Sequence, residues 1–153
     1  MSLFQYADQQ FPKRIMLVPG PGGRPGETVA ETAITPGQLG KLDGNGKLVV
    51  HGTAGGYAEP LFPIEDALQA NTLDTPYNPG DPVQTWHCAK GDVVYSWLAD
   101  GQHVQIGDYL SSAGQGDFRK VTGSDVALAV ALDALDLSVS SAHTHGRIRV
   151  RVL

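Results

Sequence analysis

Residues 147–153 read RIRVRVL, and this stretch decides the fold class. Ile148, Val150 and Val152 alternate with three arginines, which is the period-two pattern of a strand with one buried and one exposed face. A helix would scatter these apolar side chains, because its positions repeat every 3.6 residues. The segment therefore predicts a β-strand and a β-rich chain.

A second alternating stretch, SDVALAVALDALDLS at 124–138, allows two interpretations. Alanine is the best helix former, and Ser124 or Asp125 could cap a helix. Against this, Val and Leu at positions 126, 128, 130 and 132 alternate strictly with alanine. That period of two favours a buried strand over 126–132, with small residues filling its second face.

Two stretches with the same glycine spacing predict two hairpins. ITPGQLGKLDGNGKLVV at 34–50 places two apolar runs around Asp43-Gly-Asn-Gly46, the composition of a type I′ turn. VQIGDYLSSAGQGDFRKV at 104–121 repeats the Gly-x-Gly 70 residues later, at Gly114 and Gly116. This repetition indicates two similar units in one β-domain, with chance similarity in a glycine-rich chain as the alternative.

The residues between the hairpins predict a β-meander with one short helix. Pro63 followed by IEDALQAN favours a helix of about two turns, with proline at its first position. VQTWHC at 83–88 and DVVYSWLA at 92–99 are strand-like apolar runs joined by the tight connection AKGD.

Residues 1–33 are expected to form an extended N-terminal arm, and residues 34–153 the β-domain. PGPGGRPGE at 19–27 combines prolines, which lack a backbone N–H donor, with glycines, which add backbone conformational freedom. We therefore expect no regular structure there. The apolar residues of such an arm would need a partner's surface. The alternative is a frayed terminus with one edge strand.

Composition and charge exclude several classes of protein. The net charge of -5 and the pI near 5.4 argue against a protein that binds nucleic acid by neutralising phosphates. The single cysteine, Cys88, cannot form an internal disulfide, which suits synthesis in a reducing cytoplasm. We expect no secretion signal and no membrane partner, since no stretch has the required apolar length.

No group of residues has the spacing of a catalytic or metal site. His143-Thr-His145 would put two imidazoles on one face of a strand, but two ligands do not make a site. Cys88 and His87 are neighbours, so on a strand they point to opposite faces and cannot share a proton. We expect neither enzymatic activity nor a cofactor. A hydrolase or metal-dependent enzyme built on His87, His143 and His145 is the weakest alternative.

Positive charge is concentrated in the last strand. The 146 residues before Arg147 hold all 16 acids but only 8 of the 11 Lys and Arg residues. Arg147, Arg149 and Arg151 form a row that either discourages strand-on-strand aggregation at a solvated edge or meets carboxylates on a neighbouring protein.

The motifs ITPGQL at 34–39, HGTAGGYAEPLFPIED at 51–66, GDVVYSWLADGQHVQIGDYLSSAGQGDFRKV at 91–121 and the closing VALAVALDALDLS…RIRVRVL carry a resemblance. With them the chain resembles the small structural proteins encoded beside the major capsid protein in tailed phages, known as capsid decoration, cement or head-fibre proteins. The resemblance spans about residues 34–153. It contains no catalytic signature.

The resemblance implies a mainly β fold, a compact β-barrel or β-tulip-like domain. To this the residues themselves add one short helix and the extended N-terminal arm. It also implies a virion protein that forms homotrimers on the outer capsid surface, binds the major capsid protein and stabilises the shell. Candidate contacts with the shell or a neighbouring subunit, chosen on physical grounds, are Phe4, Phe11, Ile15, Leu17, Arg24, Arg147, Arg149 and Arg151.

The alternative role is a head-fibre or tail-associated module that binds a host-surface glycan. Exposed aromatic rings would act as stacking platforms for the sugar, and the candidates are Trp86, Trp97, Tyr95 and Tyr109. Burial of all four rings would remove this option.

Overall fold

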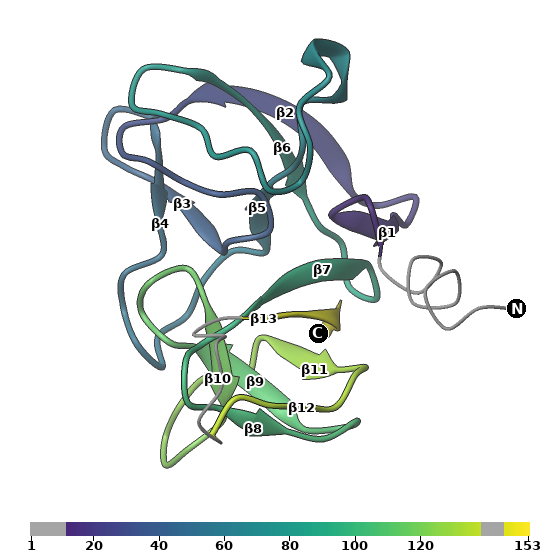
Figure 1. Cartoon of the computed structure of the whole chain (residues 1–153). Coiled ribbons are helices and arrows are strands. Elements are labelled where there is room, and N and C mark those ends of the chain that lie inside the picture. Colours follow the sequence, from purple (N-terminus) through teal and green to yellow (C-terminus); the bar gives the residue numbers. More distant parts are fainter. Residues whose placement is uncertain (1–11, 139–145) are drawn as a thin grey trace, which may run out of the picture.

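The computed structural model describes residues 12–138 and 146–153 (Figure 1). Five strands close into a barrel, in the order β7 (Val93–Leu98), β10 (Phe118–Lys120), β9 (Tyr109–Ser112), β11 (Ala129–Ala131) and β13 (Gly146–Val152). β13 pairs antiparallel with β7 over six residues and so completes the ring. Closure leaves no long unpaired strand edge in this ring, and the prediction of a mainly β, barrel-like fold is confirmed.

β13 supplies one wall of the barrel core. Ile148, Val150 and Val152 are 1%, 0% and 4% exposed, while Arg149 and Arg151 point outward and are exposed. The alternation predicted for this strand is confirmed.

β11 confirms the strand interpretation of the alanine-rich stretch but is shorter than predicted. Only Ala129–Ala131 of residues 126–132 are paired, between β9 and β13. Ala129 and Ala131 are buried, whereas Val126 is 40% exposed. A barrel of five strands has little interior room, so small side chains fit its inner face.

A three-stranded sheet and a hairpin form the second part of the fold. The sheet has the order β2 (Arg24–Val29), β6 (Pro82–His87), β5 (Leu61–Pro63), and the hairpin pairs β3 (Gly40–Leu42) with β4 (Leu48–Val50). They share a smaller core around Ile34, Leu48 and Val83, separate from the barrel core. Two short strands, β8 (His103–Val104) and β12 (Leu135–Asp136), pair beside the barrel.

β6 and β7 follow each other in the chain but belong to different sheets. β6 pairs with β2 and β5, and β7 pairs with β1, β10 and β13. The predicted meander is therefore wrong, although both strands and the turn between them are present. Gly91, with φ of +93°, allows the sharp turn at 89–92 that redirects the chain.

The described part of the predicted arm, residues 12–33, packs against the rest of the chain. β1 (Met16–Val18) pairs with β7, and β2 pairs with β6 over six residues. The expectation that residues 19–27 lack regular structure is thus wrong from Arg24 onward. Residues 1–11 lie outside the described residues.

The glycines at 20 and 23 explain how the chain between β1 and β2 is held. The buried carboxylate of Asp92 accepts hydrogen bonds from the Gly20 N–H (2.6 Å) and from Trp86 Nε1 (3.2 Å). A Cβ at Gly20 would collide with Asp92, and one at Gly23 with Trp86. The absence of a Cβ at Gly20 and Gly23 therefore lets the backbone pack directly against the side chains of Asp92 and Trp86.

The predicted two-turn helix is a single 3-10 turn, η1 (Ala67–Gln69). The Ile64 N–H bonds to the Gln84 carbonyl, so the chain is still attached to the sheet where the helix was expected to start. Ala70 then adopts a left-handed conformation with φ of +59°, which ends the turn. In residues 12–138 and 146–153, no helix is long and apolar enough to cross a bilayer.

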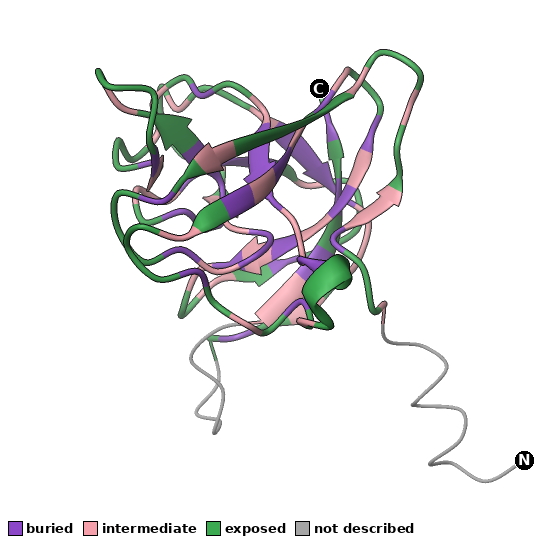
Figure 2. Cartoon of the chain, turned by 90° about the horizontal axis from the view of Figure 1, so that it is seen from above, coloured by how far each residue is buried: buried purple, intermediate pink, exposed green. Residues whose placement is uncertain are grey.

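Burial follows the barrel and the small sheet (Figure 2). The buried residues, drawn in purple, alternate along the strands, while η1 and most connecting loops are exposed. The barrel therefore presents an exposed outer face around its buried core.

Candidate protein-binding face

A groove of about 970 Å³ lies on the outer face of the barrel, where β1, β7 and β13 run side by side. Its lining is mostly apolar and includes Leu17, Val18, Val93, Ile106, Leu132 and Leu135. Val18 is 56% exposed and Ile106 is 71% exposed. Apolar side chains that gather on an outer surface are typical of a protein contact site.

Arg147 lies in this groove but is occupied within the chain. Its side chain is only 6% exposed, and it donates hydrogen bonds to Asp74 Oδ1 (2.6 Å) and the Pro36 carbonyl (3.1 Å). The guanidinium carbon lies 4.1 Å from the ring centroid of Trp97 and 5.8 Å from that of Tyr95. This arrangement fastens the loops at 36 and 74 to the barrel. Arg147 therefore holds these loops within the chain and leaves little of its side chain exposed to another protein.

Arg149 is the arginine that the groove presents to solvent. Its side chain is 50% exposed and forms a bidentate pair with Asp133, with Nη2 to Oδ1 at 2.6 Å and Nε to Oδ2 at 3.1 Å. Partial burial acts to raise the pKa of Asp133, but the hydrogen bonds from Arg149 outweigh it and the pKa is lowered. The ion pair places two oriented charged groups in a mostly apolar groove, and such groups can orient a partner's polar groups.

The other candidate contacts are dispersed. Ile15 is fully buried in the barrel core, so it cannot reach another protein. Leu17 lines the groove with Arg147 and Arg149. Arg24 is exposed on β2 and Arg151 is exposed on β13. Phe4 and Phe11 lie outside the described residues.

The four aromatic residues considered for glycan stacking differ in exposure. Tyr95, Trp97 and Trp86 are half-buried, and burial raises the pKa of Tyr95. Tyr109 is 57% exposed. An exposed ring that sequence reasoning did not single out is Tyr57, which is 72% exposed in the loop after β4. Two tyrosines, Tyr57 and Tyr109, are therefore exposed enough to stack on a sugar ring, as the glycan-binding alternative requires.

The histidine and cysteine candidates do not meet. Cys88 is buried and its thiol lies 4.0 Å from Met16 Sδ, while His87 is exposed beside Glu59 at 3.7 Å. Burial raises the pKa of the Cys88 thiol, which keeps it protonated and unreactive. His143 and His145 lie outside the described residues. Among the residues that are described, no three potential ligands are close enough together to hold a metal ion.

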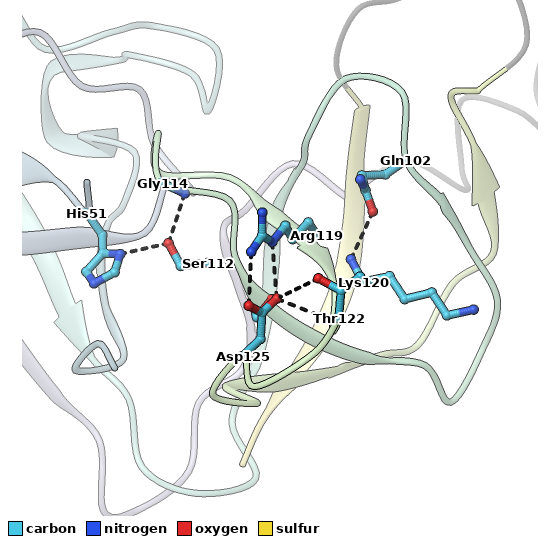
Figure 3. Close-up of polar contacts among 9 residues, drawn as sticks. His51, Gln102, Ser112, Gly114, Arg119, Lys120, Thr122 and Asp125 are labelled. Carbon is cyan, nitrogen blue, oxygen red and sulfur yellow. Dashed lines mark hydrogen bonds and ion pairs between the residues drawn. The ribbon is translucent and has the colours of Figure 1, made fainter. Parts of the chain in front are cut away.

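A second polar cluster is centred on Asp125, between β10 and β11 (Figure 3). Its carboxylate accepts hydrogen bonds from Arg119 Nη2 (3.0 Å) and Nε (3.2 Å) and from Ser111 Oγ (2.7 Å). These hydrogen bonds, that of Arg119 first, lower the pKa of Asp125 to about 2. Because all of these partners belong to the β9–β10 hairpin, the cluster fastens the following loop and is structural.

Sequence reasoning missed the acidic partners of the arginine row. Asp133 interrupts an otherwise apolar alternating stretch, and that break was an available signal for a partner of the arginine strand. Asp74 lies in a turn cluster where nothing in the local pattern distinguishes it from a solvated acid.

The fold is similar to that of a known phage protein. No family model and no curated protein matches the sequence. Among solved structures, the N base of head fiber gp8.5 of bacteriophage phi29 aligns with a TM-score of 0.56 and 8% sequence identity. The alignment covers 86% of this chain and 94% of that chain. At this level of identity the likeness is one of fold.

Proposed function

We propose that this chain is a structural virion protein of a tailed phage that attaches to the outer surface of the capsid. The observation that carries the proposal is the similarity in fold, aligned over 86% of this chain, to the base of a phage head fibre. The sequence resemblance to decoration and head-fibre proteins points to the same class. The role is mechanical and needs no catalytic group.

The groove over β1, β7 and β13 is the proposed attachment face. It combines exposed apolar side chains, Val18 and Ile106, with the oriented Arg149–Asp133 pair. Apolar burial supplies the affinity and the charged pair supplies orientation. The proposed partner is the major capsid protein, and several copies on one shell would gain avidity from multivalent attachment.

Attachment is tested by co-sedimentation with expanded capsids of the encoding phage that lack this protein. Val18→Glu combined with Ile106→Glu should reduce the bound fraction at least about tenfold, because two charges would enter an apolar contact. The matched control is Leu42→Ser, which changes an apolar residue of similar exposure, 47%, outside the groove. Wild-type protein that ignores the capsid, or groove and control variants that bind equally, would overturn the proposal.

A glycan-binding module is the second candidate, favoured by the exposed rings of Tyr57 and Tyr109. Tyr109→Ala and Tyr57→Ala should then abolish retention on host-surface polysaccharide while capsid binding is unchanged. Equal retention of wild type and both variants would remove this candidate.

A further inference from the structure

β13 runs beside β7 on the barrel wall (Figure 1), and the outward side chains of the two strands are in register. Residues directly opposite each other on antiparallel strands place their side chains next to one another on one face of the sheet. The three outward pairs are Arg147 with Trp97, Arg149 with Tyr95, and Arg151 with Val93. Each arginine of β13 therefore lies beside an apolar or aromatic side chain.

Arg151 differs from the other two arginines because it lacks an acidic partner among the described residues. Arg147 pairs with Asp74 and Arg149 pairs with Asp133, each at 2.6 Å. The side chain of Arg151 is exposed and makes no hydrogen bond or ion pair with any residue of 12–138 and 146–153. The chain itself thus neutralises two of the three guanidinium groups and leaves the third to solvent.

The neighbours of Arg151 across the sheet are apolar or aromatic on both sides. Val93 lies opposite it on β7, and Val18 of β1 lies beyond Val93. On the other side, Val130 of β11 lies opposite Arg151, and Tyr109 of β9 lies beyond Val130. The two ends of this row, Val18 and Tyr109, are 56% and 57% exposed. A single positive charge therefore lies in the middle of an apolar row.

The acids that precede members of this row in the chain are used elsewhere. Asp92 is 1% exposed, and its carboxylate accepts hydrogen bonds from backbone N–H groups at positions 20 and 89. Asp108 pairs with Lys120 Nζ at 3.5 Å. Neither carboxylate is available to Arg151.

A protein that covers this row would remove water from the Arg151 guanidinium. Val18 and Val93 line the groove of the proposed attachment face, so a protein docked there also lies against Arg151 beside them. A charge buried without a partner opposes binding, whereas a carboxylate can accept two parallel hydrogen bonds from a guanidinium. Because the described chain supplies no carboxylate here, the docked protein has to supply it.

From this guanidinium, which is unpaired within the described chain, we infer that the partner places an aspartate or glutamate on Arg151. Apolar side chains on either side of that acid would pack against Val18 and Tyr109. The partner is the outer surface of the capsid, so the assignment rests on the proposed function. It adds the charged contact by which that surface is recognised.

The contact is tested by co-sedimentation with expanded capsids that lack this protein, at ionic strengths from about 0.05 M to about 0.5 M. Arg151→Gln should raise the apparent dissociation constant at least about tenfold at low ionic strength, since a charge-assisted pair is lost. The difference should shrink at high ionic strength, because salt screens the attraction in the wild type. Arg151→Lys keeps the charge without the planar fork and should bind with intermediate strength.

The matched control is Lys41→Gln, which removes one positive charge from an exposed residue of β3 outside the groove. Its dissociation constant should stay within about twofold of the wild type at every ionic strength. Arg151→Gln should unfold at the same temperature as the wild type, because its side chain has no partner in the described chain. Thermal unfolding therefore separates a loss of binding from a loss of fold.

The variants and the wild type fail in different ways. Capsid binding by Arg151→Gln equal to that of the wild type, or an equal loss in Lys41→Gln, would overturn the inference and leave capsid attachment standing. Wild-type protein that does not sediment with the capsid would overturn the proposed function, and the inference with it. Arg151→Gln protein that binds the capsid normally but loses retention on host-surface polysaccharide would place an acidic glycan at Arg151, and this too would contradict the inference.

Discussion

The β3–β4 and β9–β10 hairpins share one glycine spacing, 70 residues apart, but differ in conformation and surroundings. In both, the residue before the first glycine donates to the residue after the second: Asp43 N–H to Lys47 O and Ala113 N–H to Asp117 O, each 2.8 Å. In the first turn only Gly46 has positive φ, so the predicted type I′ turn is wrong. In the second turn both Gly114 and Gly116 have positive φ.

The surroundings explain why this difference matters. A Cβ added at Gly44 or Gly46 would meet nothing within 4 Å, whereas one at Gly114 or Gly116 would touch a neighbouring segment. The tip of the β9–β10 hairpin is bonded to the base of the other hairpin, because Leu39 N–H donates to Gly116 O at 2.7 Å. The first turn has open space around its glycines and is tied to the chain only by exposed contacts, such as Thr28 Oγ1 to Gly46 O at 2.7 Å. The second turn forms the joint between the barrel and the small sheet.

Replacing His51, which lies in this joint, is expected to have the largest effect. Its Nε2 donates to the Tyr57 carbonyl (2.9 Å), so Nδ1 accepts from the Ser112 hydroxyl (2.7 Å), as Figure 3 shows for the latter pair. His51→Ala leaves the buried Ser112 without this partner and opens a cavity, which should cost about 3 kcal/mol of unfolding free energy. Urea unfolding measures the loss.

The control for this prediction is His103→Ala, at a histidine whose side chain is 54% exposed. Its unfolding free energy should stay within about 0.5 kcal/mol of the wild type. Equal losses for the two histidine variants would mean that the joint contributes no special stability.

The glycines give the second test, with a smaller expected effect. Gly114→Ala puts a Cβ 3.1 Å from the Ala54 N and forces φ of +93° on alanine, which should cost about 2 kcal/mol. Gly46→Ala carries only the penalty of positive φ, about 1 kcal/mol. Gly44→Ala should change stability by less than about 0.5 kcal/mol.

Thermal or urea unfolding of the three glycine variants checks this order. If Gly44→Ala destabilised the protein as much as Gly114→Ala, the turns would be equivalent and the distinction between an open turn and a joint would fail.

The sequence predicted the local strands and turns well because each is set by neighbours in the chain. The alternation in β13 and the two Gly-x-Gly turns are local patterns, and both hairpins form where expected. The meander was wrong because pairing of β6 with β2, and of β7 with β13, joins residues about 50 to 60 positions apart. Alternation along one strand carries no information on such partners.

The candidate site was predicted in part for the same reason. The row of arginines could be predicted from the sequence. Whether each side chain is available to another protein depends on residues far away in the chain. Arg147 is enclosed by Asp74 and Trp97, whereas Arg149 stays half exposed and is paired with Asp133. The groove could not be predicted from the sequence, because Val18 and Ile106 come from separate segments of the chain and come together only once β1 pairs with β7.

Acid titration is the subtlest way to separate the two hairpins, since each relies on one carboxylate. The pKa of Asp43 is lowered by the N–H groups of Lys47 and Asn45 in its own turn, and that of Asp125 is lowered to about 2, mainly by Arg119 of the second hairpin. Both carboxylates stabilise the fold above their ordinary pKa of 3.8, and this contribution is lost as the pH falls through the lowered pKa, which for Asp125 is about 2. Asp125→Asn should therefore be less stable than the wild type at pH 7, with the difference shrinking toward pH 2. Asp43→Asn should have the smaller effect at pH 7, because an amide oxygen can accept the same two backbone hydrogen bonds. Urea midpoints at pH 7, 4 and 2.5 measure both differences, and a gap between wild type and Asp125→Asn that is constant with pH would show that the charge on Asp125 does not hold the loop to the β9–β10 hairpin.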